Sequence, residues 1–289
     1  MEDNVTLSHI KIHVLHVGEV RIAPELAFGG DRCDPLKASG IFSPRSKRIW
    51  LPVSAYLIEH PKGLIVVDAG WNRDMSPNGS FDRKAQIRSL GSRLLYLVNQ
   101  GLVEHGLALD EQLHKMGIAP SDIDYLLLTH LDCDHVNGLM PLANAKHILV
   151  SRDEMEGTSR GIISKIRYQK KWWEGARIEL FDWNEMQGPF GKSFDLFDDG
   201  SITLVAIPGR SPGLFAVKIS NCEGKFVLLF SDGGYSRQSW DAMITSGIAE
   251  DKADQKVSLA WIKEQCLDPA CIEALANHDP EVIPHIIEL

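Results

Sequence analysis

The sequence has few cysteines and no close cysteine pair. Five of its 289 residues are cysteines, and none of them forms a Cys-x-x-Cys motif. They are Cys33, Cys133, Cys222, Cys266 and Cys271. Because an odd number of well-separated thiols suits neither a disulfide framework nor a cysteine-based zinc knuckle, we expect these cysteines to be reduced.

Long apolar runs are also missing. The longest runs, such as Phe226–Phe230, have the length of a β-strand, whereas a membrane-spanning helix needs about 18 apolar residues or more. The N-terminal residues Met1–Asn4 are acidic and lack the apolar segment of a secretory signal. Together with the reduced cysteines, these features predict a cytoplasmic protein with no membrane partner.

The chain has no excess of positive charge. Its formal net charge is −9 and its isoelectric point is near 5.7, which argues against nucleic acid or an anionic membrane as the main partner. Hydrophobic residues make up 44% and charged residues 24% of the chain, as is typical of a globular protein. We therefore expect a small-molecule substrate as the partner, and the sequence leaves oligomer formation open.

Apolar patterning predicts two β-rich halves with helices between them. Hairpins are expected at 10–22, turning at Gly18-Glu19, and at 53–68, turning at 60–63. Further strands are expected at 125–128, 147–150, 202–207, 214–219, 226–230 and 272–276, and helices at 84–98, 110–116, 239–245 and 254–265. Ser151 and Glu154 match a capping box for one more helix. Since no repeat or low-complexity linker interrupts the chain, we expect one domain spanning 1–289.

Two segments, 70–106 and 155–195, are interpreted as helical or loop insertions near the site. The second segment is charged and contains Trp172, Trp173 and Trp183. These tryptophans have two equally supported interpretations, which are the lining of an apolar substrate pocket and ordinary core or interface packing.

The most informative motif is His130-Leu131-Asp132-Cys133-Asp134-His135. It holds two imidazoles and two carboxylates within six residues, directly after the apolar strand expected at 125–128, and Asn137-Gly138 breaks the chain after it. A buried strand that leads into such a turn suits a catalytic metal site, because the strand fixes the ligands while the turn spreads them apart. Cys133 alternates with the two aspartates, which favours packing in the core over metal binding.

The order of motifs along the chain resembles the metallo-β-lactamase superfamily, and within it the N-acyl homoserine lactonases. These motifs are Asp68-Ala69-Gly70, the His-x-Asp-x-Asp-His turn, Pro208-Gly209-Arg210-Ser211-Pro212-Gly213, Ser231-Asp232 and a late His278. The resemblance covers roughly residues 10–279. It implies an α+β fold in which two mixed β-sheets pack face to face with helices outside, a four-layer αββα sandwich.

The family pattern is His-x-His-x-Asp-His, a later Pro-Gly-His, a bridging Asp and a final His, and it holds two metal ions. Carried over, the ligands of the second metal site are all present: Asp134, His135, Asp232 and His278. The first metal site keeps His130 and the bridging Asp232. It has Asp132 in place of the second histidine and Arg210 in place of the Pro-Gly-His imidazole. Asp68 resembles a residue that forms the turn or orients a ligand.

These two departures suggest a charge substitution. The guanidinium of Arg210 stays protonated and cannot bind a metal, but it pairs strongly with a carboxylate. We therefore hypothesise that Arg210 occupies the place of the first metal and pairs with Asp132, so that each offsets the cost of burying the other. In the alternative, Arg210 points to solvent while Asp132, His130 and Asp232 hold a hard metal such as Fe or Mn.

The resemblance implies a metal-dependent hydrolase that opens a small lactone or ester by attack of a metal-bound hydroxide. The intact ligand set suits Zn²⁺, with one ion favoured over two, and tolerates Fe²⁺ or Mn²⁺. Asp134 or Asp132 would carry the proton to the leaving group, and Arg210 would stabilise negative charge. Tyr235 follows the lactonase pattern Asp-x-x-Tyr after Asp232 and would donate its phenol to the substrate, unless it is simply a buried tyrosine.

Other functions remain open at this point. A phosphodiester or thioester hydrolase of the same superfamily is the first alternative, and a non-hydrolytic relative that uses the fold for binding is the second. Fold alone does not separate them, because one fold supports many chemistries.

Overall fold

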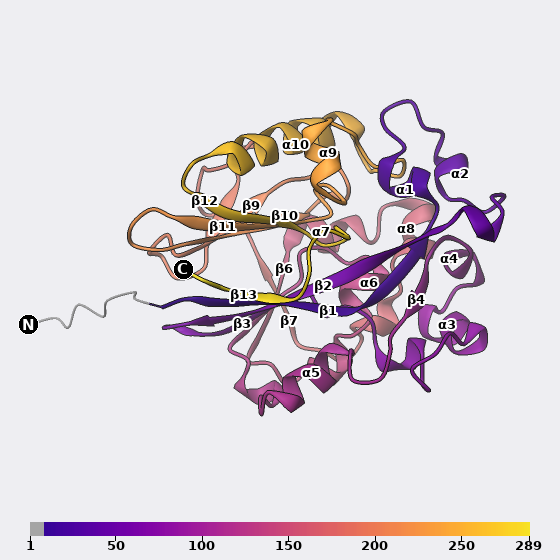
Figure 1. The fold of residues 1–289 in the computed structure, drawn as a ribbon, viewed down its shortest axis with the longest axis horizontal. Helices are drawn as coiled ribbons and strands as arrows, with labels where there is room; N and C mark the ends of the chain where they lie inside the picture. Colours follow the sequence, from indigo (N-terminus) through magenta and orange to yellow (C-terminus); the bar gives the residue numbers. More distant parts are fainter. Residues whose placement is uncertain (1–8) are drawn as a thin grey trace, which may run out of the picture.

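The computed structural model describes residues 9–289, and in it two β-sheets pack face to face (Figure 1). The acidic Met1–Asn4 segment lies outside the described residues. The larger sheet contains β1 (Lys11–Ile22), β2 (Ile49–His60), β3 (Gly63–Val67), β4 (Gln100–Leu102), β5 (Tyr125–Leu127), β6 (His147–Ser151), β7 (Ile178–Phe181) and β13 (His285–Glu288). The smaller sheet contains β8 (Ser193–Asp195), β9 (Ile202–Ala206), β10 (Phe215–Ser220), β11 (Phe226–Ser231) and β12 (Cys271–Ala276).

Both sheets are mixed, as expected for the α+β fold class. In the larger sheet the order is β13-β1-β2-β3-β5-β6-β7, with β4 paired to β1. Its first strands pair antiparallel, whereas β3, β5, β6 and β7 run parallel. In the smaller sheet the order is β12-β11-β10-β9-β8, and only the β11–β12 pair is parallel.

Short helices and one long helix surround the sheets. They are α1 (Pro24–Phe28), α2 (Pro35–Ala38), α3 (Arg83–Leu90), α4 (Arg93–Val98), α5 (Leu109–Lys115), α6 (Cys133–Val136), α7 (Arg152–Gly157), α8 (Gly161–Arg167), α9 (Arg237–Asp241) and α10 (Lys252–Leu267). Helices α9 and α10 lie beyond the smaller sheet and α5 lies beyond the larger one (Figure 1). The expected four-layer αββα arrangement is therefore present. In the described residues, no helix is both long enough and apolar enough to cross a membrane.

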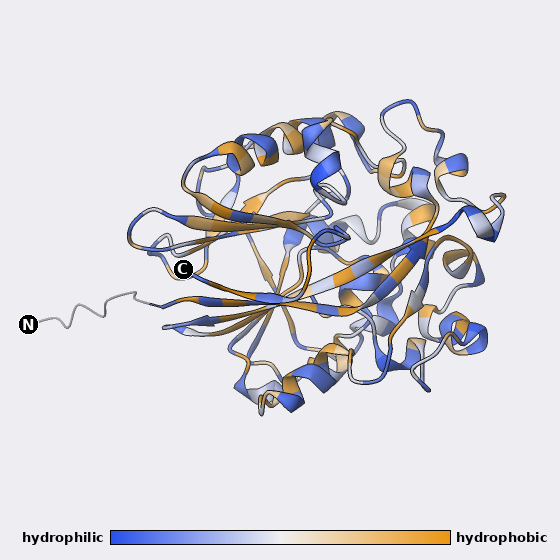
Figure 2. Ribbon diagram, in the orientation of Figure 1, coloured by the Kyte–Doolittle hydropathy of each residue, from blue (hydrophilic) through white to orange (hydrophobic). Residues whose placement is uncertain are grey.

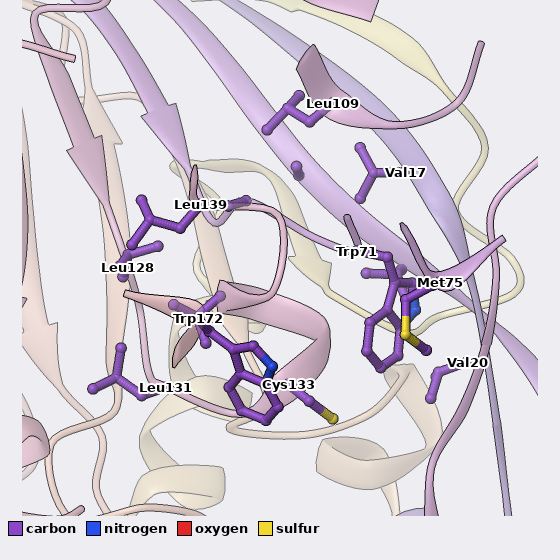
Figure 3. Close-up of a cluster of buried hydrophobic side chains, with 14 of the residues drawn as sticks. Val17, Val20, Trp71, Met75, Leu109, Leu128, Leu131, Cys133, Leu139 and Trp172 are labelled. Carbon is purple, nitrogen blue, oxygen red and sulfur yellow. The ribbon is translucent and has the colours of Figure 1, made fainter. Parts of the chain in front are cut away.

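Three apolar clusters fill the spaces between these layers. One lies between the sheets and includes Ile12 and Val14 of β1, and a second joins the smaller sheet to α9 and α10 through Leu259 and Ile262. The third joins the larger sheet to the helices on its outer face and is drawn in part in Figure 3. Strands with apolar residues on both faces are expected wherever a sheet is covered on both sides. Along α10, hydrophilic and hydrophobic residues alternate as on a half-buried helix (Figure 2).

The first expected hairpin is wrong. Residues 11–22 form one strand, β1, and its pairing register with β2 shifts between His16 and Glu19. Gly18 has φ +118° and lies within this β-bulge, so the glycine marks an extra residue in a strand and not a reversal of the chain. The second hairpin is confirmed, because β2 pairs antiparallel with β3.

The helix expected at 84–98 is divided in two. Gly91 adopts a left-handed conformation (φ +71°) and ends α3, and the side chain of Ser92 then caps α4 by accepting from Leu95 N. The apolar spacing continues across this break, which is why the sequence pattern indicates a single helix. Segment 155–195 contains helices, as expected, and also β7 and β8, which extend the two sheets.

Candidate metal centre

Several candidate ligands, and Asp68, which contacts one of them, follow the ends of β-strands. Asp68 comes directly after β3, Asp232 directly after β11 and His278 soon after β12, while His130 begins the turn that follows β5. Asp68 and Ser231 have φ of +59° and +47°, so the chain turns sharply where β3 and β11 end. Left-handed backbone at non-glycine residues is uncommon and is often found at functional sites. The fold thus brings together segments that are distant in sequence, at the C-terminal ends of strands from both sheets.

The second-site ligands lie together, although the sequence separates them by up to 144 residues, from Asp134 to His278. His278 Nε2 is 3.4 Å from Asp134 Oδ2 and 3.1 Å from Asp232 Oδ1. His135 Nε2 is 3.4 Å from the same Asp232 oxygen. Two ligands bound tetrahedrally to zinc at about 2.0–2.1 Å lie about 3.3 Å apart, so this spacing fits a single dication.

The ring nitrogens of the histidines are arranged for metal binding. His135 Nδ1 lies 2.8 Å from Asp68 Oδ2, and His278 Nδ1 lies 2.8 Å from the carbonyl oxygen of Pro52. These acceptors place the proton on Nδ1 and leave Nε2 as a lone-pair donor. The Nε2 atoms of His130, His135 and His278, together with Asp232 Oδ1, are buried without a hydrogen-bond partner among the described residues. Buried polar atoms normally have partners, so these orphaned atoms fit a bound metal ion.

Asp68 links the His135 ring to Thr129 through hydrogen bonds. Its Oδ1 accepts from Thr129 N at 2.8 Å, and the Thr129 hydroxyl bonds both carboxylate oxygens. Burial alone would lower the pKa of His135, but the carboxylates of Asp68 and Asp232 raise that pKa well above its usual value. The pair therefore fixes the ring orientation of His135 and increases its basicity as a ligand.

Arg210 lies between the carboxylates of Asp132 and Asp232. Its Nη2 is 2.6 Å from Asp132 Oδ2, and its Nε is 3.4 Å from Asp232 Oδ2. His130 Nε2 faces the same two oxygens at 3.4 and 3.7 Å. The ion pair hypothesised from the sequence is thus present. The alternative, with Arg210 in solvent, is wrong because only 7% of the residue is exposed.

A second arginine, which sequence reasoning missed, completes this ion pair. Arg167 of α8 reaches Asp132 with two parallel bonds, Nε to Oδ1 at 2.5 Å and Nη2 to Oδ2 at 2.8 Å. Its Nη2 also donates to the backbone oxygen of Arg210 at 3.2 Å. Burial alone would raise the pKa of Asp132, but Arg167 and Arg210 hold that pKa well below its usual range. No local motif marks Arg167, because its partner is 35 residues away.

Glu154 ties the ligand turn to the loop that carries Arg210. Its Oε1 accepts from Leu131 N at 3.0 Å, and its Oε2 accepts from Ser211 Oγ at 2.7 Å and Gly213 N at 3.0 Å. The predicted cap is present in part, since Ser151 Oγ accepts from Glu154 N at 3.2 Å. The carboxylate of Glu154 makes long-range contacts, which the capping-box pattern does not indicate.

Tyr235 and Cys133 lie beside the centre. The ring of Tyr235 stacks on that of His278 with 5.1 Å between ring centroids, and the residue is buried. Cys133 is buried in the apolar cluster of Figure 3, together with Leu131 and Trp172, which agrees with packing and not metal binding. Trp172 belongs to the same cluster, which supports the core interpretation for this tryptophan.

Known proteins resemble this chain in sequence and fold. The family model described as metallo-beta-lactamase superfamily matches residues 48–161. The N-acyl homoserine lactonase AiiB of Agrobacterium fabrum is 28% identical over 289 residues, covering 96% of each chain. The lactonase AttM of the same organism is 25% identical over 242 residues, covering 80% of this chain and 83% of AttM.

A solved structure has the same fold. It is an N-acyl homoserine lactone hydrolase with the product N-hexanoyl-L-homoserine bound at its catalytic metal centre. Its TM-score is 0.71 at 19% sequence identity, over 96% of this chain and 95% of the other. Residues 48–161 thus match the metallo-β-lactamase superfamily model, and the chain as a whole is similar in sequence and fold to N-acyl homoserine lactonases.

Proposed function

We propose that this protein is a metal-dependent hydrolase that opens a small lactone or ester. The observation that carries the proposal is the convergence of four buried ligands, Asp134, His135, Asp232 and His278. The Nε2 atoms of His135 and His278 lie 3.4 and 3.1 Å from Asp232 Oδ1, and His278 Nε2 lies 3.4 Å from Asp134 Oδ2. The similarity to proteins named N-acyl homoserine lactonases supports a lactone as the substrate class.

We further propose that the centre works with one ion. Two imidazoles and two carboxylates suit Zn²⁺ and also accept Fe²⁺ or Mn²⁺. The first site does not fit a second ion, because the guanidinium of Arg210 contacts the Asp132 and Asp232 oxygens that would bind it. A dication placed beside this fixed cation would be repelled.

The residues around the ion have separate tasks in this proposal. A bound dication supplies an acidic water, and hence a nucleophile at neutral pH. Asp134 carries the proton to the leaving alkoxide, since both oxygens of Asp132 already accept from arginines. Arg210 stabilises developing negative charge with an Nη1 atom that is buried and has no partner among the described residues. Tyr235, stacked on His278, positions that imidazole and offers its phenol to the substrate.

The test combines metal analysis with a hydrolysis panel. We expect the purified protein to hold one ion per chain and to hydrolyse lactones faster than phosphodiesters or thioesters. His278→Ala should lose both the ion and the activity, whereas His285→Ala, which alters a histidine on β13 paired with Glu273, should keep both. Loss of metal without loss of activity would refute the metal-dependent mechanism. A bound ion with no hydrolysis of any panel member would favour the non-hydrolytic alternative.

A further inference from the structure

A small apolar cavity lies against the charged residues of the first site. It has a volume of about 210 Å³ and is lined largely by aliphatic side chains, among them Leu94 and Val98 of α4 and Ile163 and Ile166 of α8. Its charged lining residues are Asp132, Arg167 and Arg210. An aliphatic cavity that meets a few convergent polar groups is typical of a small-molecule site.

The charged wall of this cavity has an excess of positive charge. Two guanidinium groups share the single carboxylate of Asp132. The nearest other carboxylate, Asp232, is 3.4 Å from Arg210 Nε and is also a candidate metal ligand. Arg210 is 93% buried, yet its Nη1 and Nε atoms have no hydrogen-bond partner among the described residues. The hydrogen bonds of Arg167 use its Nε and Nη2 atoms.

The geometry points to a site for a short aliphatic chain that ends in a carboxylate. The chain would fill the cavity between α4 and α8, and its carboxylate would accept from the guanidinium groups of Arg210 and Arg167. A carboxylate there neutralises the surplus cation and supplies the buried donors with a charged acceptor. The assignment of this chain as part of a substrate or product rests on the proposed function.

The carboxylate has two chemically consistent sources. The substrate can carry it in addition to the ester or lactone that reacts. Alternatively, hydrolysis generates it: the acyl C–O bond breaks, the oxygen of water joins the acyl carbon, the alcohol oxygen takes one proton and the acid releases the other. The alcohol leaves when the substrate is an ester and stays on the same molecule when it is a lactone. In both cases the site recognises the same group, an alkyl carboxylate.

Direct binding tests the site without relying on turnover. Hexanoate and hexanamide, which have equal chain length, are titrated by calorimetry into the purified full-length protein with its metal. We expect hexanoate to bind at least tenfold more tightly than hexanamide, and more tightly than acetate because acetate lacks the chain. Equal affinity for hexanoate and hexanamide would overturn the proposal, since the cavity would then not recognise the anion.

Variants separate binding by arginine from binding by the metal. Arg210→Met should weaken hexanoate binding tenfold or more, and unchanged binding would mean that the carboxylate binds the ion instead. Ile163→Glu provides a variant that does not touch the buried pair, because Ile163 is 79% exposed at the cavity. It should also weaken hexanoate binding. The matched control is Ile283→Glu, at a 68% exposed position that does not line this cavity, and it should bind hexanoate like the wild type.

Kinetics with paired esters distinguish the two sources. If the substrate carries the carboxylate, monomethyl adipate should show a several-fold lower KM than methyl hexanoate, and Arg210→Met should remove that difference. If hydrolysis generates it, the two esters should have similar KM values while hexanoate inhibits competitively. If neither ester nor any lactone is hydrolysed but hexanoate still binds through Arg210, the proposed function fails and the carboxylate site stands.

Discussion

Arg210 Nη2 lies 2.6 Å from Asp132 Oδ2, and these two residues stand at the positions where the lactonase pattern has two metal-binding histidines. Either change alone would leave a buried charge without a partner, whereas the two changes together make an ion pair that offsets part of its own desolvation. In the proposed single-ion centre, Arg210 supplies at the first site a positive charge that is fixed to the protein.

Asp132→Asn should destabilise the fold strongly. The substitution keeps the shape of the side chain but removes the carboxylate that Arg167 and Arg210 share. Breaking a buried ion pair by removing one partner costs about 3–5 kcal/mol, and urea unfolding measures this loss. Asp182→Asn is the control, because the Arg152–Asp182 pair is exposed and should contribute little. If both substitutions lower the free energy of unfolding by a similarly small amount, the buried ion pairs of Asp132 with Arg167 and Arg210 do not contribute strongly to stability.

Restoring both histidines should restore the second ion. In the Asp132→His, Arg210→His double variant, two imidazoles join His130 and Asp232 at the first site. The metal content should therefore rise from one ion per chain to two, as measured by metal analysis. Arg210→His alone should stay near one ion and lose stability, because Asp132 then keeps only Arg167 as its cationic partner. If the single variant binds the second ion as well as the double variant does, Arg210 alone excludes that ion and Asp132 has no part in it.

The Arg73–Glu111 pair gives a pH-dependent prediction away from the metal. Arg73 donates to both oxygens of Glu111 at 2.7 and 2.6 Å, and this hydrogen-bonded pairing lowers the pKa of Glu111 below its ordinary value of 4.5. Because the pKa is lower in the folded state, the pair stabilises the fold above pH 4.5 and the contribution is lost as the pH falls through the folded-state value.

The variant that tests this pair is Glu111→Gln. It should be about 1 kcal/mol less stable than the wild type at pH 7, and the difference should shrink in acid. Denaturant unfolding of both proteins at several pH values measures the difference, in which effects of acid on the metal centre cancel. A difference that stays constant between pH 7 and pH 3 would contradict the assignment.

Much of the fold could be predicted because apolar runs mark buried strands directly. The segments 147–150 and 226–230 fall in strands of the structure, and 125–128 exceeds its strand, β5, by one residue. Local backbone conformation was harder to predict. The sequence predicts a turn at Gly18, but the residue lies in a β-bulge, since a glycine with positive φ occurs in both tight turns and bulges. β13 is only four residues long, and the sequence signal for such a short edge strand is weak.

At the site, the ligands could be predicted but their supports could not. The His-x-Asp-x-Asp-His motif and the positions of Asp232 and His278 follow from the resemblance. The contacts of Arg167 with Asp132, and of Glu154 with Leu131 and Gly213, join segments 23 to 59 residues apart. Tertiary folding alone creates such contacts. Arg167 lies in no motif, and the capping box that includes Glu154 does not indicate the long-range contacts of its carboxylate.

Asp68→Asn should weaken metal binding without removing a ligand. In the wild type, Asp68 accepts from His135 Nδ1, which leaves His135 Nε2 free to bind the ion. An asparagine that keeps its oxygen on Thr129 N presents its amide N–H to His135 instead. The imidazole would then accept at Nδ1 and carry its proton on Nε2, the tautomer that cannot bind a metal.

We therefore expect a loss of metal affinity of about 10- to 100-fold for Asp68→Asn, measured by competition with a chelator. Asp124→Asn is a suitable control, because Asp124 also accepts from a backbone N–H, that of Leu64, but its side chain pairs with exposed Lys146. Loss of affinity in both variants would indicate general loosening of the fold. If Asp68→Asn binds the metal as tightly as the wild type, the tautomer of His135 does not depend on the Asp68 carboxylate. The bound ion itself would then select that tautomer.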